Sequence, residues 1–198
     1  MRLFVAVVLS DENQRRLRAQ TNWLVQAHAD VLRATPDGML HLTLAFMGRA
    51  AGGEAAAIGE AMQQVAQQCT QFSIELAAPR VLRARQDPRL VLLPVTARAD
   101  RVERLTRELH SAITARLPSL EVSPAKSAHV TLARFRKKAR ASDGHAVERS
   151  LTGAGDSSLV LHEDVRDIRL FESTLTTSGP EYRELSFVEF FPDKGASQ

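Results

Sequence analysis

The sequence contains the pattern His-x-Thr-Leu-Ala twice, at residues 41–45 and at residues 129–133. Both copies lie in runs of aliphatic and β-branched residues, which predicts a strand at each place. Successive side chains of a strand point to opposite faces, so the His and the Thr of one copy share a face. Each strand is therefore expected to present an imidazole and a hydroxyl side by side, with the residue between them turned into apolar packing.

The two copies are 88 positions apart (129 − 41), and the same offset relates other parts of the chain. Residues 3–5 fall on residues 91–93, and Leu17 falls on Leu105. We infer an internal duplication, in which residues 1–198 form one domain of two lobes related by an approximate two-fold axis. Such an arrangement would direct both motif faces to one central cleft.

Two histidines across a cleft suit general acid–base catalysis, because imidazole titrates near neutral pH. In-line displacement at phosphorus needs such a pair: one ring deprotonates water and the other protonates the leaving oxygen. The two threonine hydroxyls would donate hydrogen bonds to the non-bridging oxygens, which become more negative in the transition state. This chemistry requires no metal, and the His/His pair lacks a third ligand at any recognisable zinc-site spacing. A strained 2′,3′-cyclic phosphate would be a natural substrate.

Composition is ordinary for a globular protein of this size. The 198 residues carry a formal charge of +3, a mild basicity that is compatible with an anionic substrate. Cys69 is the only cysteine, so an internal disulfide and a thiolate metal site are excluded, and a reducing cytoplasm fits best. The apolar run at residues 3–9 is too short to span a membrane and is expected to be a buried strand. We expect a monomer without a cofactor.

Hydrophobic periodicity and turn residues predict the remaining elements. Helices are expected over residues 11–33, 54–68, 100–117 and 142–151. Strands are expected over residues 72–77, 165–175 and 182–191, with a hairpin over residues 81–95, a loop over residues 153–156 and a frayed tail from Pro192. The fold class that follows is α+β, with a mostly antiparallel sheet in each lobe, helices on the outer faces and a central cleft.

The residues in and around the two motifs resemble those of the 2H phosphoesterases, and within them most closely the bacterial RNA 2′,3′-cyclic phosphodiesterases. The likeness extends over nearly the whole chain, and the segments that carry it are residues 2–6, 40–48, 80–82, 129–134, 170–173 and 179–182. The resemblance implies a pseudo-symmetric two-lobed fold that acts on RNA ending in a 2′,3′-cyclic phosphate and leaves a 2′-phosphomonoester. It assigns His41 as the proton donor and His129 as the proton acceptor. It also implies that Thr43, Thr131 and Arg134 bind the phosphate.

Some features depart from the family pattern or from the symmetry. Ala128 stands where the family usually has proline, and Phe46 in the first lobe occupies the position that Arg134 has in the second. Arg134 lies an odd number of residues after His129, so plain alternation points it away from the cleft, and only the resemblance places it near phosphate. Phe46, Phe135 and Trp23 are expected in the core. Without a paired threonine, the other histidines are interpreted as surface or packing residues: His28, His110, His145 and His162.

Other functions remain open for the same residues. One is 2′-5′ RNA ligation or its reversal, and another is a related cyclic-nucleotide or 2′-5′ oligonucleotide phosphodiesterase. A third is a module that binds phosphate or RNA without turnover. The intact His and Thr of both motifs argue against that third function.

Overall fold

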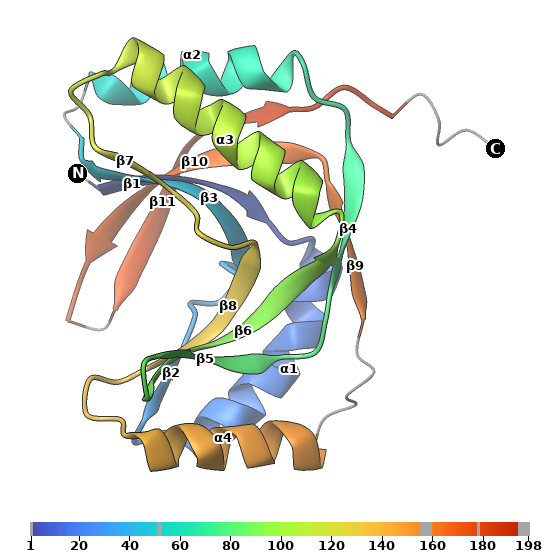
Figure 1. The fold of residues 1–198 in the computed structure, drawn as a ribbon, viewed down its shortest axis with the longest axis vertical. Helices are drawn as coiled ribbons and strands as arrows, with labels where there is room; N and C mark the ends of the chain where they lie inside the picture. Colours follow the sequence, from blue (N-terminus) through green and yellow to red (C-terminus); the bar gives the residue numbers. More distant parts are fainter. Residues whose placement is uncertain (1, 51–52, 155–159, 178, 194–198) are drawn as a thin grey trace.

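The computed structural model describes residues 2–50, 53–154, 160–177 and 179–193, and it has the predicted α+β architecture (Figure 1). Its helices are α1 (Asp11–Ala27), α2 (Glu54–Ala66), α3 (Ala99–Arg116) and α4 (Ala141–Ala154). Its strands are β1 (Arg2–Val8), β2 (Leu32–Ala34), β3 (His41–Arg49), β4 (Phe72–Leu76), β5 (Arg80–Ala84), β6 (Asp87–Ala97), β7 (Val122–Pro124), β8 (His129–Phe135), β9 (Leu161–Val165), β10 (Asp167–Leu175) and β11 (Pro180–Glu189).

The strands form one curled path in the order β11-β10-β1-β3-β8-β6-β4-β9, and every pairing between these neighbours is antiparallel. In Figure 1 the path divides into an upper lobe with β1, β3, β10 and β11 and a lower lobe with β5, β6 and β8. Helices α2 and α3 cover the outside of the upper lobe, and α1 and α4 lie outside the lower one. The predicted fold class is therefore confirmed.

Apolar residues explain why the first strand and helix form where they do. Residues 3–7 of β1 are all buried, because both faces of this central strand are covered. Helix α1 begins after Ser10, whose Oγ accepts a hydrogen bond from the Asn13 N–H at 3.4 Å. Leu17 and Leu24 then line the buried face of the helix, so α1 packs on the sheet by an amphipathic stripe.

The lobes exchange short strands. Strand β7, from the second half of the sequence, pairs with β3 of the first half. Strand β2, from the first half, pairs with β8 of the second. The residue after each short strand continues the contact, because the N–H of Ala125 donates to Leu44 O at 3.0 Å and the N–H of Thr35 donates to Leu132 O at 2.9 Å. Each motif strand is thus braced by the opposite half of the sequence.

The two motif strands also share an irregularity. In the β1–β3 ladder, Val5 pairs with Ala45 and the next residue, Ala6, pairs with Thr43, so Leu44 is an extra residue. The β6–β8 ladder repeats this bulge one lobe later, with Leu132 as the extra residue between Ala133 and Thr131. Because Val5 and Val91 are equivalent here, the first strands correspond at an offset of 86 (91 − 5), and the alignment of residues 3–5 with 91–93 is wrong by two. The repeated bulge supports the duplication that we propose for this chain.

Several expected boundaries are wrong. The strand expected over residues 165–175 begins at Asp167, because Val165 ends the unpredicted strand β9. The helix expected over residues 11–33 ends at Ala27, and Leu32 belongs to β2, where it is fully buried opposite Phe135. A hydrogen-bonded turn from His28 intervenes, so Val31 reaches the core from the turn and not from the helix. The loop expected over residues 153–156 is wrong for residues 153 and 154, which belong to α4. Residues 155–156 lie outside the described residues, as does the tail from residue 194.

Candidate active site

The two motif strands meet at one point. Leu42 of β3 pairs with Val130 of β8, and both side chains are fully buried in the core. His41, Thr43, His129 and Thr131 occupy the alternate positions and are all partly exposed. Extending this antiparallel register by one residue in each direction places His41 opposite Thr131 and Thr43 opposite His129. The four predicted side chains therefore lie on one face, arranged symmetrically about the Leu42–Val130 contact.

The backbone fixes the same tautomer for both imidazoles. His41 Nδ1 lies 2.7 Å from the carbonyl oxygen of Met39, and His129 Nδ1 lies 3.0 Å from that of Ser127. A carbonyl oxygen only accepts, so each Nδ1 carries the hydrogen and donates it. The Ser127 Oγ, at 3.2 Å, is a second acceptor for the His129 N–H. In both lobes the Nε2 atom is left to exchange protons with a substrate.

The bulge decides where Arg134 points. The extra residue Leu132 makes Leu132 and Ala133 buried in succession, and this resets the alternation by one residue. Arg134 is consequently exposed, and it lines the same cavity as His41. The expectation from plain alternation is wrong, because it assumed an unbroken ladder. The bulge in β3 has the same effect on Phe46.

Burial and nearby positive charge both lower the pKa of the two imidazoles. Burial is the main cause that lowers the pKa of His41 and of His129 below 6.5, partly offset by the backbone hydrogen bonds. The charge of Arg134 lowers both pKa values further, and the charge of Arg80 lowers that of His129. The two rings also interact, since a proton on His129 lowers the pKa of His41. Both rings are therefore ready to be neutral near pH 7, and an anion between them would favour protonation.

Aromatic side chains surround His41 on the upper lobe. The ring of Phe4 lies 5.1 Å from the imidazole, and Tyr182 approaches edge-on at 5.8 Å, both measured between ring centroids. With Phe46 and Arg134 they line a cavity of about 300 Å³. Phe46 is 48% exposed and Trp23 is 44% exposed, so their expected core positions are wrong, whereas Phe135 packs against the core. No sequence pattern assigned a role to Tyr182, although it lies in a segment that carries the family resemblance.

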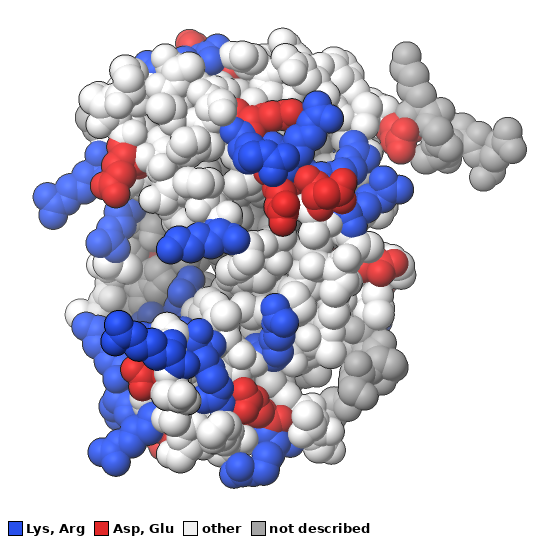
Figure 2. Space-filling view, viewed as in Figure 1, with Lys and Arg blue, Asp and Glu red and all other residues white. Residues whose placement is uncertain are grey.

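Basic side chains gather on the lower lobe. Figure 2 shows Lys and Arg over the region where β2, β5 and α4 lie in Figure 1, beside the hollow between the lobes. The sheet register brings two of these cations to the motif face, because Arg80 pairs with Leu92, which pairs with Thr131, and Arg33 pairs with Arg134. This lobe is thus the more cationic side of the cleft.

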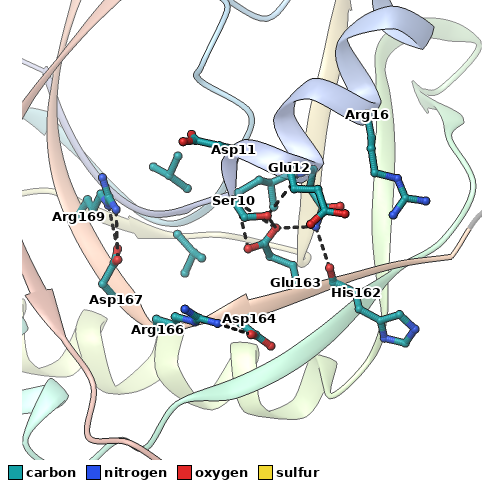
Figure 3. A pocket seen from close by; sticks show the side chains of 14 residues that line it. Ser10, Asp11, Glu12, Arg16, His162, Glu163, Asp164, Arg166, Asp167 and Arg169 are labelled. Carbon is teal, nitrogen blue, oxygen red and sulfur yellow. Dashed lines mark hydrogen bonds and ion pairs between the residues drawn. The ribbon is translucent and has the colours of Figure 1, made fainter.

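A larger cavity, of about 660 Å³, contains neither motif histidine (Figure 3). Its charged side chains are largely paired with one another: Arg166 with Asp164 at 2.8 Å, and Arg169 with Asp167 at 2.8 Å. Size alone therefore does not locate the candidate site in this molecule.

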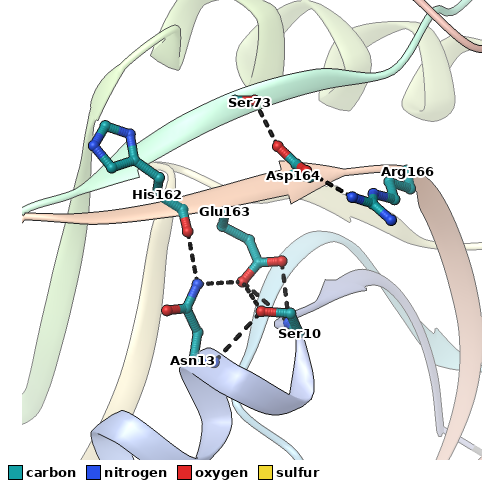
Figure 4. Close-up of polar contacts among 7 residues, drawn as sticks. All are labelled: Ser10, Asn13, Ser73, His162, Glu163, Asp164 and Arg166. Carbon is teal, nitrogen blue, oxygen red and sulfur yellow. Dashed lines mark hydrogen bonds and ion pairs between the residues drawn. The ribbon is translucent and has the colours of Figure 1, made fainter.

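Glu163, in the wall of that cavity, has a structural role (Figure 4). It is only 3% exposed, and its carboxylate accepts hydrogen bonds from the Ser10 N–H at 3.0 Å, the Ser10 Oγ at 3.1 Å and the Asn13 Nδ2 at 2.8 Å. Negative charge is favourable at this end of α1 because the first N–H groups of a helix lack partners. Glu163 thus ties β9 to the start of α1.

We predict that Glu163→Ala lowers the free energy of unfolding by about 2–4 kcal/mol, because it removes several charge-assisted hydrogen bonds that join β9 to the start of α1. Urea unfolding followed by circular dichroism measures the change. Asp164→Asn, at the exposed neighbour, is the matched control and is expected to cost less than about 1 kcal/mol. Equal losses for the two variants would contradict this role of Glu163.

The family relationships of the chain agree with this geometry. The model of the 2′-5′ RNA ligase superfamily matches residues 10–163, which include both motifs. The chain belongs to the 2′-5′ RNA ligase superfamily. This superfamily member is 34% identical to the RNA 2′,3′-cyclic phosphodiesterase of Aeropyrum pernix over 82% of the chain and 89% of that protein. It is 28% identical to the Archaeoglobus fulgidus protein of the same name over 96% and 100% of the two chains.

A solved structure has the same fold as this chain. The Thermus thermophilus protein TT0787 superposes with a TM-score of 0.75 at 22% identity, over 98% of this chain and 100% of that one. The predicted resemblance to 2H phosphoesterases is therefore confirmed at the level of family and fold. Among the described residues, no helix is long and apolar enough to cross a membrane, and no three His, Cys, Asp or Glu side chains group as potential metal ligands.

Proposed function

We propose that this protein hydrolyses the 2′,3′-cyclic phosphate at the end of an RNA to a 2′-phosphomonoester, without a metal ion. The observation that carries the proposal is the matched pair of imidazoles. Each donates its Nδ1 hydrogen to a backbone carbonyl, and each stands beside a threonine on the face around Leu42 and Val130. The names of the Aeropyrum pernix and Archaeoglobus fulgidus relatives support the same activity.

In the proposed reaction, each of the two imidazoles carries out one proton transfer. His129 Nε2 takes a proton from water as the water oxygen bonds to phosphorus. The bond from phosphorus to the ribose O3′ breaks, and His41 Nε2 gives its proton to that oxygen. The phosphate stays on O2′. His129 then loses its proton to solvent and His41 takes one up, which restores the starting state. General acid and base steps of this kind are each worth about 10²–10⁴-fold in rate.

The remaining residues stabilise the charge that develops on phosphorus. The Thr43 and Thr131 hydroxyls donate hydrogen bonds to the two non-bridging oxygens, and Arg134 supplies a full positive charge beside both histidines. In this scheme the protein itself provides the electrostatic stabilisation, which is why we propose that no metal is needed. The aromatic cavity next to His41 would hold the nucleoside that carries the leaving oxygen.

An oligoribonucleotide with a 2′,3′-cyclic phosphate end tests the proposal. We expect conversion to the 2′-phosphate at the same rate with and without EDTA, measured by chromatography and phosphorus NMR. Loss of activity in EDTA that added metal restores would contradict the metal-independent mechanism, and a 3′-phosphate product would contradict the assignment of the leaving oxygen. Adding an RNA with a free 5′-hydroxyl to the same assay reveals whether 2′-5′ ligation competes with hydrolysis.

A further inference from the structure

Two arginines lie directly opposite each other on the cleft face of the lower lobe. Arg33 of β2 pairs with Arg134 of β8 in the antiparallel ladder, so their Cβ atoms are about 5 Å apart and their side chains share a face. Both are exposed, and neither forms an ion pair with a carboxylate of the described residues. Like charges in this arrangement destabilise a sheet. An anionic ligand would relieve the repulsion.

The Arg33 side chain approaches the turn between β10 and β11 of the upper lobe. A β-carbon added to Gly179, at the turn between β10 and β11, would lie 3.4 Å from Arg33 Nη1, so the guanidinium rests against the glycine backbone. Gly179 has a φ of +143°, a conformation that favours glycine and so permits this approach. The hairpin also carries Tyr182, whose pKa is raised by burial and lowered by the charges of Arg134 and Arg33. Arg33 is therefore near the ring that contacts His41.

In the upper lobe, Arg169 occupies the row that corresponds to the row of Arg80 in the lower lobe. Two carboxylates neutralise the charge of Arg169. Arg169 pairs with Ala6, which pairs with Thr43, just as Arg80 pairs with Leu92 and through it with Thr131. Arg169 contacts Asp167 at 2.8 Å and Glu184 at 3.1 Å. The charge of Arg169 is therefore not available to an additional phosphate, whereas the charges of Arg33 and Arg134 are.

We propose that Arg33 binds the 5′-phosphate of the terminal nucleotide, the group that joins this nucleotide to the rest of the RNA. This inference rests on the proposed function, in which Arg134 contacts the cyclic phosphate and the nucleoside lies on the His41 side. One nucleotide carries the two phosphates at opposite ends of its ribose, and two paired arginines on adjacent strands offer one cation to each. The cleft would then select the end of an RNA chain over an isolated nucleoside cyclic phosphate.

Two substrates that differ by one phosphate isolate this contact: adenosine 2′,3′-cyclic phosphate and the same compound with a 5′-phosphate. For the wild type we expect kcat/KM to be about tenfold higher with the 5′-phosphate, as for a charge-assisted contact that is partly exposed. In Arg33→Met the ratio between the two substrates should fall to about one. Lys138→Met removes an exposed charge from the same lobe and should keep the ratio, which controls for long-range attraction.

A binding measurement tests the same contact without relying on catalysis. Calorimetry with adenosine 2′-monophosphate and adenosine 2′,5′-bisphosphate should show tighter binding of the bisphosphate, and this preference should disappear in Arg33→Met. If the wild type hydrolyses neither cyclic compound yet shows this preference, the proposed function fails and the phosphate subsite stands. If the wild type hydrolyses both compounds equally well and binds both ligands equally, or if Arg33→Met keeps the wild-type ratio, the subsite is refuted.

Discussion

Replacing His41 or His129 by alanine is expected to lower turnover of a terminal 2′,3′-cyclic phosphate by about 10³-fold, because each variant removes one of two proton transfers. Both rings are only partly exposed and both donate from Nδ1 to the backbone, so in the proposed mechanism the remaining Nε2 transfers the proton. The residual rate of each variant should lose one limb of the bell-shaped pH profile. Single-turnover kinetics across pH measure both effects.

His162→Ala is the matched control for these variants. This imidazole is exposed on β9 and lies 3.8 Å from Glu75, outside the cavity that contains His41. Its loss should leave the rate within about twofold of the wild type, as expected for a surface substitution. A His41 or His129 variant that keeps both limbs and a rate near that of the control would refute the acid–base pair.

Replacing Arg134 by methionine should lower kcat/KM by about 10²–10³-fold and also move the pH dependence. The loss follows from removing a charge that stabilises the transition state. The shift follows because the charge of Arg134 lowers the pKa of both histidines, so its removal raises both values. The wild-type maximum of kcat/KM should lie below pH 6.5, since burial and Arg134 lower both pKa values, and the maximum of the variant should lie at higher pH.

Arg136→Met removes the same charge two residues further along, from a side chain whose Nε donates to Ala29 O on the surface. We expect this control to keep the pH of the maximum. A maximum that stays at the wild-type pH in Arg134→Met would contradict the effect of the Arg134 charge on both rings, even if the rate fell.

The motif strands could be predicted from sequence because the polar His and Thr residues alternate with buried apolar residues, which is the period of a strand. The orientation of Arg134 could not, because it depends on a bulge that the β6–β8 ladder reveals. A signal was nevertheless present: Leu44–Ala45 and Leu132–Ala133 are adjacent apolar pairs, and two successive buried residues break strict alternation. The family resemblance assigned Arg134 to the phosphate, whereas alternation without the bulge pointed it the other way.

Other parts of the site depend on contacts between distant segments. Strands β2 and β7 have three residues each, too few for a periodic signal, and each is stabilised by a partner from the other half of the chain. Sequence periodicity placed Arg33 in a helix for this reason. Glu163 was missed because a glutamate in a polar strand is usually exposed. Only the distant Ser10 and Asn13 show why it is buried.

The exchange of β2 and β7 has an evolutionary consequence if the halves are copies of one ancestor. A polypeptide of half this length would have lacked the bracing strand for its own histidine, so two such molecules would have had to associate to complete one reaction centre. In that symmetric dimer either imidazole could serve as acid or base. Fusion into one chain would then have let the two halves diverge, and the difference between Phe46 and Arg134, at equivalent positions, would be a product of that divergence.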